Sequence, residues 1–182
     1  MKSITYKAIL FDLDGTIVNT IGDITFAMNK ALVHYGVDPI SDAEGKMCVG
    51  RGLRNALLEA CKLKGRPISD TELDDMLTIL LQTYTLYPTQ FAYEYEGASE
   101  FLAQCDKMGI TIGVLSNKED SLVQIIVKKL FPHIPFSFVL GAHRDYPLKP
   151  DPTSIEAFMT SYTIKKDELL FVGDSEVDGL TA

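Results

Sequence analysis

The chain has 182 residues, enough for one sizeable hydrophobic core and a small additional module but too few for two full-sized domains. Apolar residues make up 46% of the sequence and charged residues 23%, which excludes an intrinsically disordered chain. The formal net charge of -8 argues against nucleic acid or an anionic membrane surface as a partner.

No segment of the sequence has the pattern of a membrane anchor. The longest apolar runs have the length of strands, and residues 1–14 lead into a strand without a secretion signal. We therefore expect a cytoplasmic protein. Cys48, Cys61 and Cys105 are scattered and lack the spacing of metal ligands, so we interpret them as small packing residues.

The first half of the chain begins with a strand and continues with helices. Residues 6–11 form a short apolar run of strand-forming residues, and Gly15 marks a sharp turn after it. Between residues 18 and 92 the apolar period becomes helical, with helices predicted near 21–35, 51–63 and 70–87. We expect this segment to form an all-helical insert.

From Gly97 onward, predicted strands alternate with predicted helices. The strands cover residues 110–116, 136–141 and 168–174, and the helices cover residues 98–108, 119–130 and 152–161. Such alternation predicts an α/β fold with a doubly wound, Rossmann-like parallel sheet that is covered on both faces. The expected domains are a core of residues 1–17 and 93–182 and a helical domain of residues 18–92.

Four polar segments follow the apolar runs or join them. They are FDLDGT at 11–16, LSNK at 115–118, KPDP at 149–152 and GDSEVD at 173–178. Ligands of open parallel sheets bind beyond the carboxyl ends of the strands, where these segments are expected to meet. The pattern favours a metal-assisted phosphoryl-transfer site.

The acidic residues of these segments suit a divalent cation. Asp12 and Asp14 are two residues apart, so on a regular strand their carboxylates point the same way and repel each other. A hard cation such as Mg²⁺ compensates for this repulsion, with Asp174 as a further ligand and Asp178 holding a metal-bound water. Asp12 is then the candidate nucleophile towards phosphorus, and Asp14 is the candidate general acid and base.

The remaining polar groups suit a transferring phosphoryl group. Ser116 and Asn117 are candidate donors to its oxygens, and Lys149 supplies a positive charge to the phosphate and to the nucleophile. Gly15 permits close approach of the backbone, and the amides up to Thr16 are candidate phosphate ligands. Positioning and charge stabilisation account for most of the catalysis of phosphoryl transfer.

Each segment has a simpler explanation when it is taken alone. A lone D-x-D is often a loop or a helix cap, residues 115–118 are ordinary after a strand, and residues 149–152 suit a turn. In residues 173–178, Asp174 or Ser175 suits a helix N-cap. The order of all four segments on one α/β pattern favours the catalytic interpretation.

The four segments resemble, in order, motifs one to four of the haloacid dehalogenase-like hydrolase superfamily. The resemblance implies Asp12 as the nucleophile, Asp14 as the general acid and base, and Mg²⁺ held by Asp12, Asp174 and the backbone carbonyl of Asp14. It also implies that the helical insert is a cap of the C1 type, which closes over the substrate.

Within the superfamily, residues 49–60 and the stretch YEGASEFLAQCDKMGITIGVLSNK look most similar to phosphoglycolate phosphatases. This similarity implies that Gly50, Arg51 and Gly52 form a specificity loop, with Arg51 or Arg54 meeting a carboxylate of the substrate. A helix-entry loop with solvated arginines is the alternative.

The sequence departs from the family pattern at its end. Family members continue after the fourth motif with a strand and a closing helix, so the C-terminal part of the core is expected to be missing and residues 168–173 to form an exposed edge strand. The function expected first is a Mg²⁺-dependent phosphatase of a small phosphate ester, acting as a monomer or a homodimer. A phosphomutase of the beta-phosphoglucomutase type and a non-catalytic binding protein are the alternatives.

Overall fold

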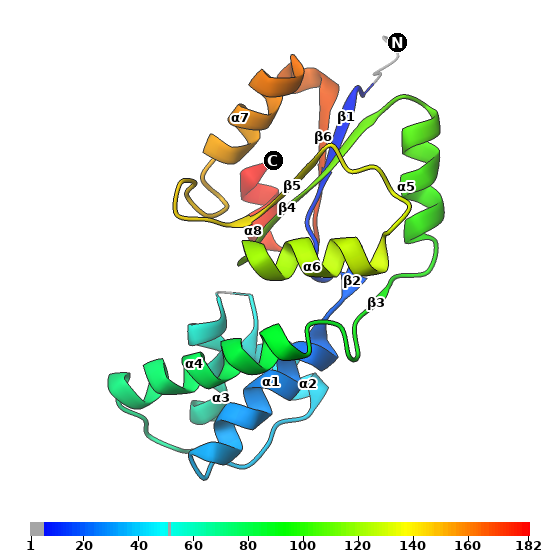
Figure 1. The fold of residues 1–182 in the computed structure, drawn as a ribbon. Helices are drawn as coiled ribbons and strands as arrows, with labels where there is room; N and C mark the ends of the chain where they lie inside the picture. The colour runs from blue at the N-terminus through cyan, green and yellow to red at the C-terminus, as the bar shows by residue number, and fades with distance from the viewer. Residues whose placement is uncertain (1–5, 51) are drawn as a thin grey trace. The chain divides into compact units, whose positions relative to one another are not determined.

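The computed structural model describes residues 6–50 and 52–182 (Figure 1). The described residues form two compact units, of which one comprises residues 6–19 and 93–182 and the other lies between residues 20 and 92. The expected boundaries were residues 17/18 and 92/93. Among the described residues, no helix combines the length and the apolar character needed to cross a membrane.

The first unit contains a four-stranded parallel sheet with the strand order β5-β4-β1-β6. Its strands are β1 (Ala8–Phe11), β4 (Thr111–Glu119), β5 (Phe138–Ala142) and β6 (Leu169–Val172). Phe11, the last residue of β1, is level with Val114 of β4 and Val172 of β6. The polar residues that follow β1 and β6, and those in the last part of β4, therefore lie at the carboxyl ends of the strands.

Helices cover both faces of this sheet (Figure 1). They are α5 (Ala98–Lys107), α6 (Asp120–Leu130), α7 (Thr153–Tyr162) and α8 (Glu176–Thr181), with a 3₁₀ turn at Lys166–Glu168. Successive residues of β1 point to opposite faces: Leu10 belongs to the cluster around Phe158 of α7, whereas the ring of Phe11 lies 6.2 Å from that of Phe101 of α5. Because both faces are covered, every residue of β1 is apolar and buried.

The second unit is all-helical, as its apolar period predicts. It contains α1 (Ile21–His34), α2 (Asp42–Cys48), α3 (Leu53–Leu63) and α4 (Asp70–Leu86). The predicted helices correspond to α1, α3 and α4, but α2 was not predicted. Its start carried a usable signal, because Ser41 and Glu44 form a capping box.

The chain leaves the first unit and returns to it through a short antiparallel ribbon. The ribbon pairs β2 (Val18–Asn19) with β3 (Tyr93–Glu94). Within the helical unit, the buried carboxylate of Asp23 accepts hydrogen bonds of 2.8 Å from the backbone N–H groups of Phe91 and Ala92. Asp23 thus joins the first helix of that unit to its last segment.

Candidate active site

The centre of the site is a buried lysine between two carboxylates. The Lys149 Nζ lies 2.7 Å from Asp12 Oδ1 and 2.6 Å from Asp178 Oδ1. Only 4% of the Lys149 side chain is exposed, and the ring of Phe171 lies 5.5 Å from its Nζ. A buried ammonium needs such partners, so this three-residue arrangement fixes the charge of Lys149 beside Asp12.

The two carboxylates of this arrangement respond differently to their surroundings. Burial raises the pKa of Asp12 from 3.8 to about 6, because the attraction of Lys149 offsets only part of the desolvation, and Asp178 and Asp14 add repulsion. Burial also acts against ionisation of Asp178, but the hydrogen bonds from Lys149 and Ser175 outweigh it and lower the pKa of Asp178. Asp178 is therefore the more firmly ionised partner of Lys149.

Asp14 has a lysine partner of its own. The Lys118 Nζ lies 2.7 Å from Asp14 Oδ1 and 2.9 Å from Asp14 Oδ2. Lys118 belongs to the LSNK segment, but the sequence pattern alone predicts no role for it. The prediction ended this strand at Ser116, whereas β4 continues to Glu119, and the longer strand carries Lys118 into the site.

The alternation of β4 separates the side chains of its polar end. Ser116 and Lys118 are buried, whereas Asn117 between them is exposed. The Asn117 side chain pairs with the backbone of Lys149: its Nδ2 donates to the Lys149 carbonyl at 2.9 Å, and its Oδ1 accepts from the Lys149 N–H at 2.8 Å. Asn117 thereby positions Lys149, and its contact with a phosphate stays a prediction, as does that of Ser116.

Three carboxylates of the site are close enough together to hold a metal ion. Asp12, Asp174 and Asp178 each offer an oxygen, and these oxygens lie within 4.8 Å of one another. Such a set of hard oxygen donors fits Mg²⁺. Both oxygens of Asp178 already accept hydrogen bonds, Oδ1 from Lys149 and Oδ2 from Ser175, whereas among the described residues only Oδ1 of Asp12 accepts one, from Lys149. Asp12 and Asp174 are therefore the better placed ligands.

Two glycines allow the strand ends to approach one another. A Cβ on Gly15, whose φ is +86°, would lie 2.2 Å from Asp174 Oδ2. A Cβ on Gly173 would lie 2.4 Å from the Cβ of Asp178. Glycine at these two positions therefore leaves room for the side chains of Asp174 and Asp178.

The helical unit carries the residues predicted to determine specificity. Gly52 is the N-cap residue of α3 with φ +85°, and Arg51 lies outside the described residues. Arg54 forms ion pairs of 3.0 Å with Asp70 and 2.7 Å with Asp74 of α4. These contacts hold its guanidinium within the helical unit, and its contact with a substrate stays a prediction.

The chain matches a known protein family over most of its length. The model of the family described as haloacid dehalogenase-like hydrolase matches residues 9–182, which include all four polar segments. The chain belongs to this family. The resemblance seen in the sequence is thus confirmed, as is the α/β fold with a parallel sheet.

This haloacid dehalogenase-like hydrolase is similar to named bacterial proteins and to a solved structure. The phosphoglycolate phosphatase of Rhodospirillum rubrum is 32% identical over 180 residues, with 97% of this chain and 75% of the relative covered. The phosphoglycolate phosphatase of Cereibacter sphaeroides is 30% identical over 174 residues, with coverages of 96% and 79%. A solved structure from Lactobacillus delbrueckii subsp. bulgaricus is similar with a TM-score of 0.90 at 27% identity and covers 98% of this chain and 82% of its own.

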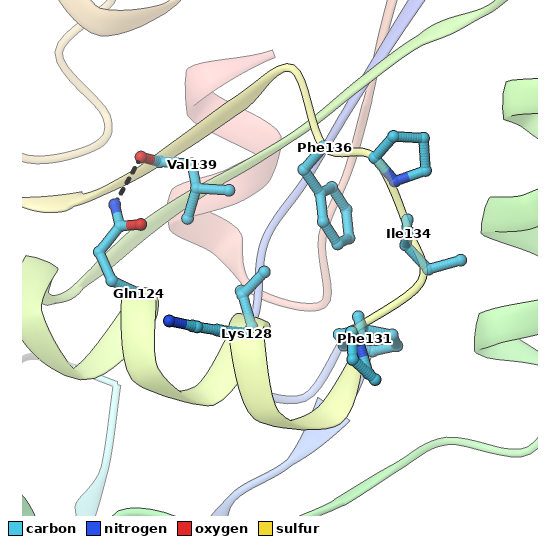
Figure 2. Close-up of a pocket in the computed structure, with 9 residues that line it drawn as sticks. Gln124, Lys128, Phe131, Ile134, Phe136 and Val139 are labelled. Atoms are coloured by element: carbon cyan, nitrogen blue, oxygen red, sulfur yellow. Dashed lines mark hydrogen bonds between the residues drawn. The ribbon is translucent and has the colours of Figure 1, made fainter.

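A surface pocket of this hydrolase lies apart from the acidic residues of the site. It has a volume of about 390 Å³ and lies between the C-terminal half of α6 and the segment of residues 131–139 (Figure 2). Its lining is mostly apolar, with Gln124 and Lys128 as polar members, and Gln124 donates a hydrogen bond of 2.9 Å to the Val139 carbonyl. The lining contains no carboxylate, so the pocket lacks the groups for the chemistry of the four motifs.

Proposed function

We propose that the protein hydrolyses a small phosphorylated metabolite through a phosphoryl group carried on Asp12, with Mg²⁺ as the cofactor. A haloacid dehalogenase-like hydrolase with these phosphatase relatives is a phosphoric monoester hydrolase. The observation that carries the mechanism is the buried Lys149 between Asp12 and Asp178, with Asp14 two residues further along. This arrangement supplies a nucleophile, a fixed cation and a second carboxylate within one site.

The first half-reaction transfers the phosphoryl group to Asp12. An oxygen of Asp12 attacks phosphorus, the bond between phosphorus and the leaving oxygen breaks, and the electron pair of that bond goes to the leaving oxygen. Asp14 gives its proton to this oxygen, so the product leaves as an alcohol. Lys149 stabilises the negative charge on the phosphoryl oxygens, with Ser116 and the amides of the loop up to Thr16 as further donors.

The second half-reaction returns Asp12 to its carboxylate form. Asp14 takes a proton from a water molecule, and the water oxygen attacks the phosphorus of the aspartyl-phosphate. The bond between phosphorus and Asp12 breaks, and inorganic phosphate leaves. One residue acts as acid and then as base, so each turnover restores its starting protonation.

The carboxylates that fit Mg²⁺ also define what the ion contributes. Asp12 and Asp174 would hold it together with the backbone carbonyl of Asp14, and Asp178 would lie beside them in its ion pair with Lys149. The bound ion would supply positive charge that offsets the repulsion between the acids and the phosphate. Without the ion, the site contains more carboxylates than ammonium groups, and the approach of an anionic ester is disfavoured.

The preferred substrate is a phosphate ester similar to phosphoglycolate. The support is the name shared by the two bacterial relatives and the helical unit inserted between the first and second motifs. We propose that this unit, residues 18–92 as predicted, is the specificity cap. Gly52, Arg51 and Arg54 remain its candidate substrate contacts.

Phosphate release from a panel of metabolite esters, with Mg²⁺ and with a chelator, tests the function. We expect phosphoglycolate to be hydrolysed only with Mg²⁺, and Asp12→Asn to lose at least about 10³-fold in kcat. Asp106→Asn is the matched control, because Asp106 is an exposed carboxylate on α5. Full activity of Asp12→Asn would disprove the mechanism.

Two other outcomes separate the alternative functions. Acid-quenched enzyme should carry one phosphoryl group on the peptide that contains Asp12, detected by mass spectrometry. If this group returns to a sugar phosphate and no phosphate is released, the protein is a phosphomutase. If no ester reacts although the protein unfolds cooperatively on heating, it is a binding protein.

A further inference from the structure

The second lysine of the site, Lys118, is buried and holds both oxygens of one carboxylate. Its Nζ lies 2.7 Å and 2.9 Å from the two oxygens of Asp14, and 4% of its side chain is exposed. An ion pair on the surface costs side-chain entropy and contributes little, but this pair is desolvated on the lysine side. The fold therefore holds the Lys118 ammonium in one place, and a carboxylate bound through both oxygens has a defined orientation.

The backbone of β4 determines where Lys118 points. β4 continues through Ser116 and Asn117 to Glu119, and its alternation directs the side chains of Ser116 and Lys118 into the buried region. The Lys118 N–H donates to Ser116 Oγ at 3.2 Å. The side chain thus extends from the end of β4, in the stretch between Leu115 and Glu119 where the register of β4 with β5 shifts.

The two aspartates of the first motif have separate cations. Lys149 lies against Asp12 and Asp178, whereas Lys118 lies against Asp14. If Lys118 were neutral, Asp14 would lose the cation that contacts both of its oxygens. The second lysine thus gives Asp14 a positive partner that is separate from the partner of Asp12.

We propose that Lys118 is a positioning residue, which fixes the carboxyl group of Asp14 in the orientation needed to give a proton to the leaving oxygen and to take one from the attacking water. This inference rests on the function proposed above. In the first step, Asp14 loses its proton to the alkoxide oxygen as the phosphorus–oxygen bond breaks, and Lys118 holds the resulting carboxylate. In the second step, the same carboxylate takes a proton from water.

The dependence of the rate on the leaving group distinguishes this role from a structural one. Glycolate is a poor leaving group that needs a proton, whereas p-nitrophenolate leaves without one. For Lys118→Met, we expect the single-turnover phosphorylation rate with phosphoglycolate to fall about 10²-fold. The burst of p-nitrophenolate from p-nitrophenyl phosphate should change by less than about threefold, while the steady-state rate after the burst falls, because water activation also uses Asp14.

Two further variants complete the test. Lys118→Arg keeps the charge and can bind both oxygens, so it should recover the phosphoglycolate rate to within about tenfold of wild type. Lys129→Met removes an exposed lysine of α6 and should leave all rates unchanged. Thermal unfolding is measured for each variant, and Lys118→Gln replaces Lys118→Met if the latter does not fold.

The outcomes separate this inference from the proposed function. An equal fall in the rates with both esters, or no fall with either, overturns the positioning role while wild-type hydrolysis leaves the proposed function intact. If wild type forms no aspartyl-phosphate from either ester, the proposed function and the inference fail together. A selective loss with phosphoglycolate that Lys118→Arg reverses supports the inference.

Discussion

The side-chain amide of Asn117 pairs with the backbone of Lys149 on both sides, as donor to the carbonyl at 2.9 Å and as acceptor from the N–H at 2.8 Å. The two residues are 32 positions apart, and these bonds join the end of β4 to the loop that precedes α7. The loop backbone is thereby fixed where the Lys149 side chain enters the site. An amide is the side chain that can supply one donor and one acceptor in this geometry.

Replacing Asn117 should therefore impair catalysis through Lys149. For Asn117→Ala, we expect kcat/KM for phosphoglycolate to fall by about 10- to 100-fold, because small displacements of a catalytic group are costly. Asn117→Asp should be at least as harmful, since its carboxylate faces the Lys149 carbonyl. Steady-state kinetics checks both variants, and Gln104→Ala, an exposed side chain of α5, is the control. Unchanged kinetics of Asn117→Ala would show that the loop is held by other contacts.

Lys149 itself should matter for stability as well as for turnover. Lys149→Met leaves the buried carboxylates of Asp12 and Asp178 without their cation, and loss of one partner of a buried pair costs about 3–5 kcal/mol. We expect this loss in urea unfolding with a chelator, and a smaller loss with Mg²⁺, because the proposed ion would supply positive charge to the same acids.

A surface lysine provides the comparison for Lys149. Lys7 pairs with Glu168 at 2.7 Å, but 58% of its side chain is exposed. Lys7→Met should therefore change the free energy of unfolding by less than about 1 kcal/mol. Similar losses for Lys7→Met and Lys149→Met would contradict the burial argument.

Much of the fold could be predicted because its signals are local. β1 is a run of apolar residues that stops at Asp12, and the alternation of strands and helices after Gly97 indicates a parallel sheet. Helix α2 was missed because it has only seven residues, too few for a helical period to show. Its capping box was visible in the sequence, but a capping signal alone is weak evidence for a helix.

The site was predictable in its composition but not in its pairings. The spacing of Asp12, Asp14 and Asp174 after apolar runs placed them at strand ends, where the register of the sheet now brings β1 and β6 together. Which lysine meets which acid depends on side-chain directions at the end of β4. The prediction stopped that strand at Ser116, so Lys118 was not assigned a role, and the pairing of Asn117 with a loop 32 residues away has no local signal.

Gly15 should be irreplaceable for steric reasons. In Gly15→Ala the new Cβ would lie 2.2 Å from Asp174 Oδ2, in a conformation that also strains an L-residue. We expect Asp174 to be displaced and Mg²⁺ affinity, measured by calorimetry, to fall at least about tenfold. Gly109→Ala separates strain from collision, because Gly109 has φ +74° but no atom within 4 Å of a Cβ. It should lose stability but keep wild-type Mg²⁺ affinity.

Mg²⁺ should stabilise the folded protein through Asp174. A ligand that binds only the folded state raises Tm, and at about 100 times its Kd the gain is about 2.7 kcal/mol. We expect Mg²⁺ to raise the Tm of wild type but not that of Asp174→Asn. Glu176→Gln removes a neighbouring charge at the start of α8 and should keep the response. An equal rise in Tm for Asp174→Asn would place the ion elsewhere.

Asp12 should make the stability of the metal-free protein depend on pH. Burial raises its pKa from 3.8 to about 6, so between about pH 4 and pH 6 the folded state keeps a proton that the unfolded state has lost. The free energy of unfolding therefore decreases as pH rises through this window. A shift of about two pKa units corresponds to a contribution of about 3 kcal/mol by pH 7.

The difference between wild type and Asp12→Asn isolates this contribution. The variant has no proton to lose at position 12, whereas acids with a lowered pKa, such as Asp178, act with the opposite sign in both proteins. With a chelator present, the free energy of unfolding of wild type minus that of the variant should decrease between pH 4 and pH 7. The neutral amide also weakens the pair with Lys149, which shifts the difference by an amount that changes little with pH. The diagnostic quantity is therefore the slope of this free-energy difference against pH, measured by urea unfolding. A difference that is flat or rises with pH would mean that Asp12 is ionised in the folded protein as readily as in the unfolded chain.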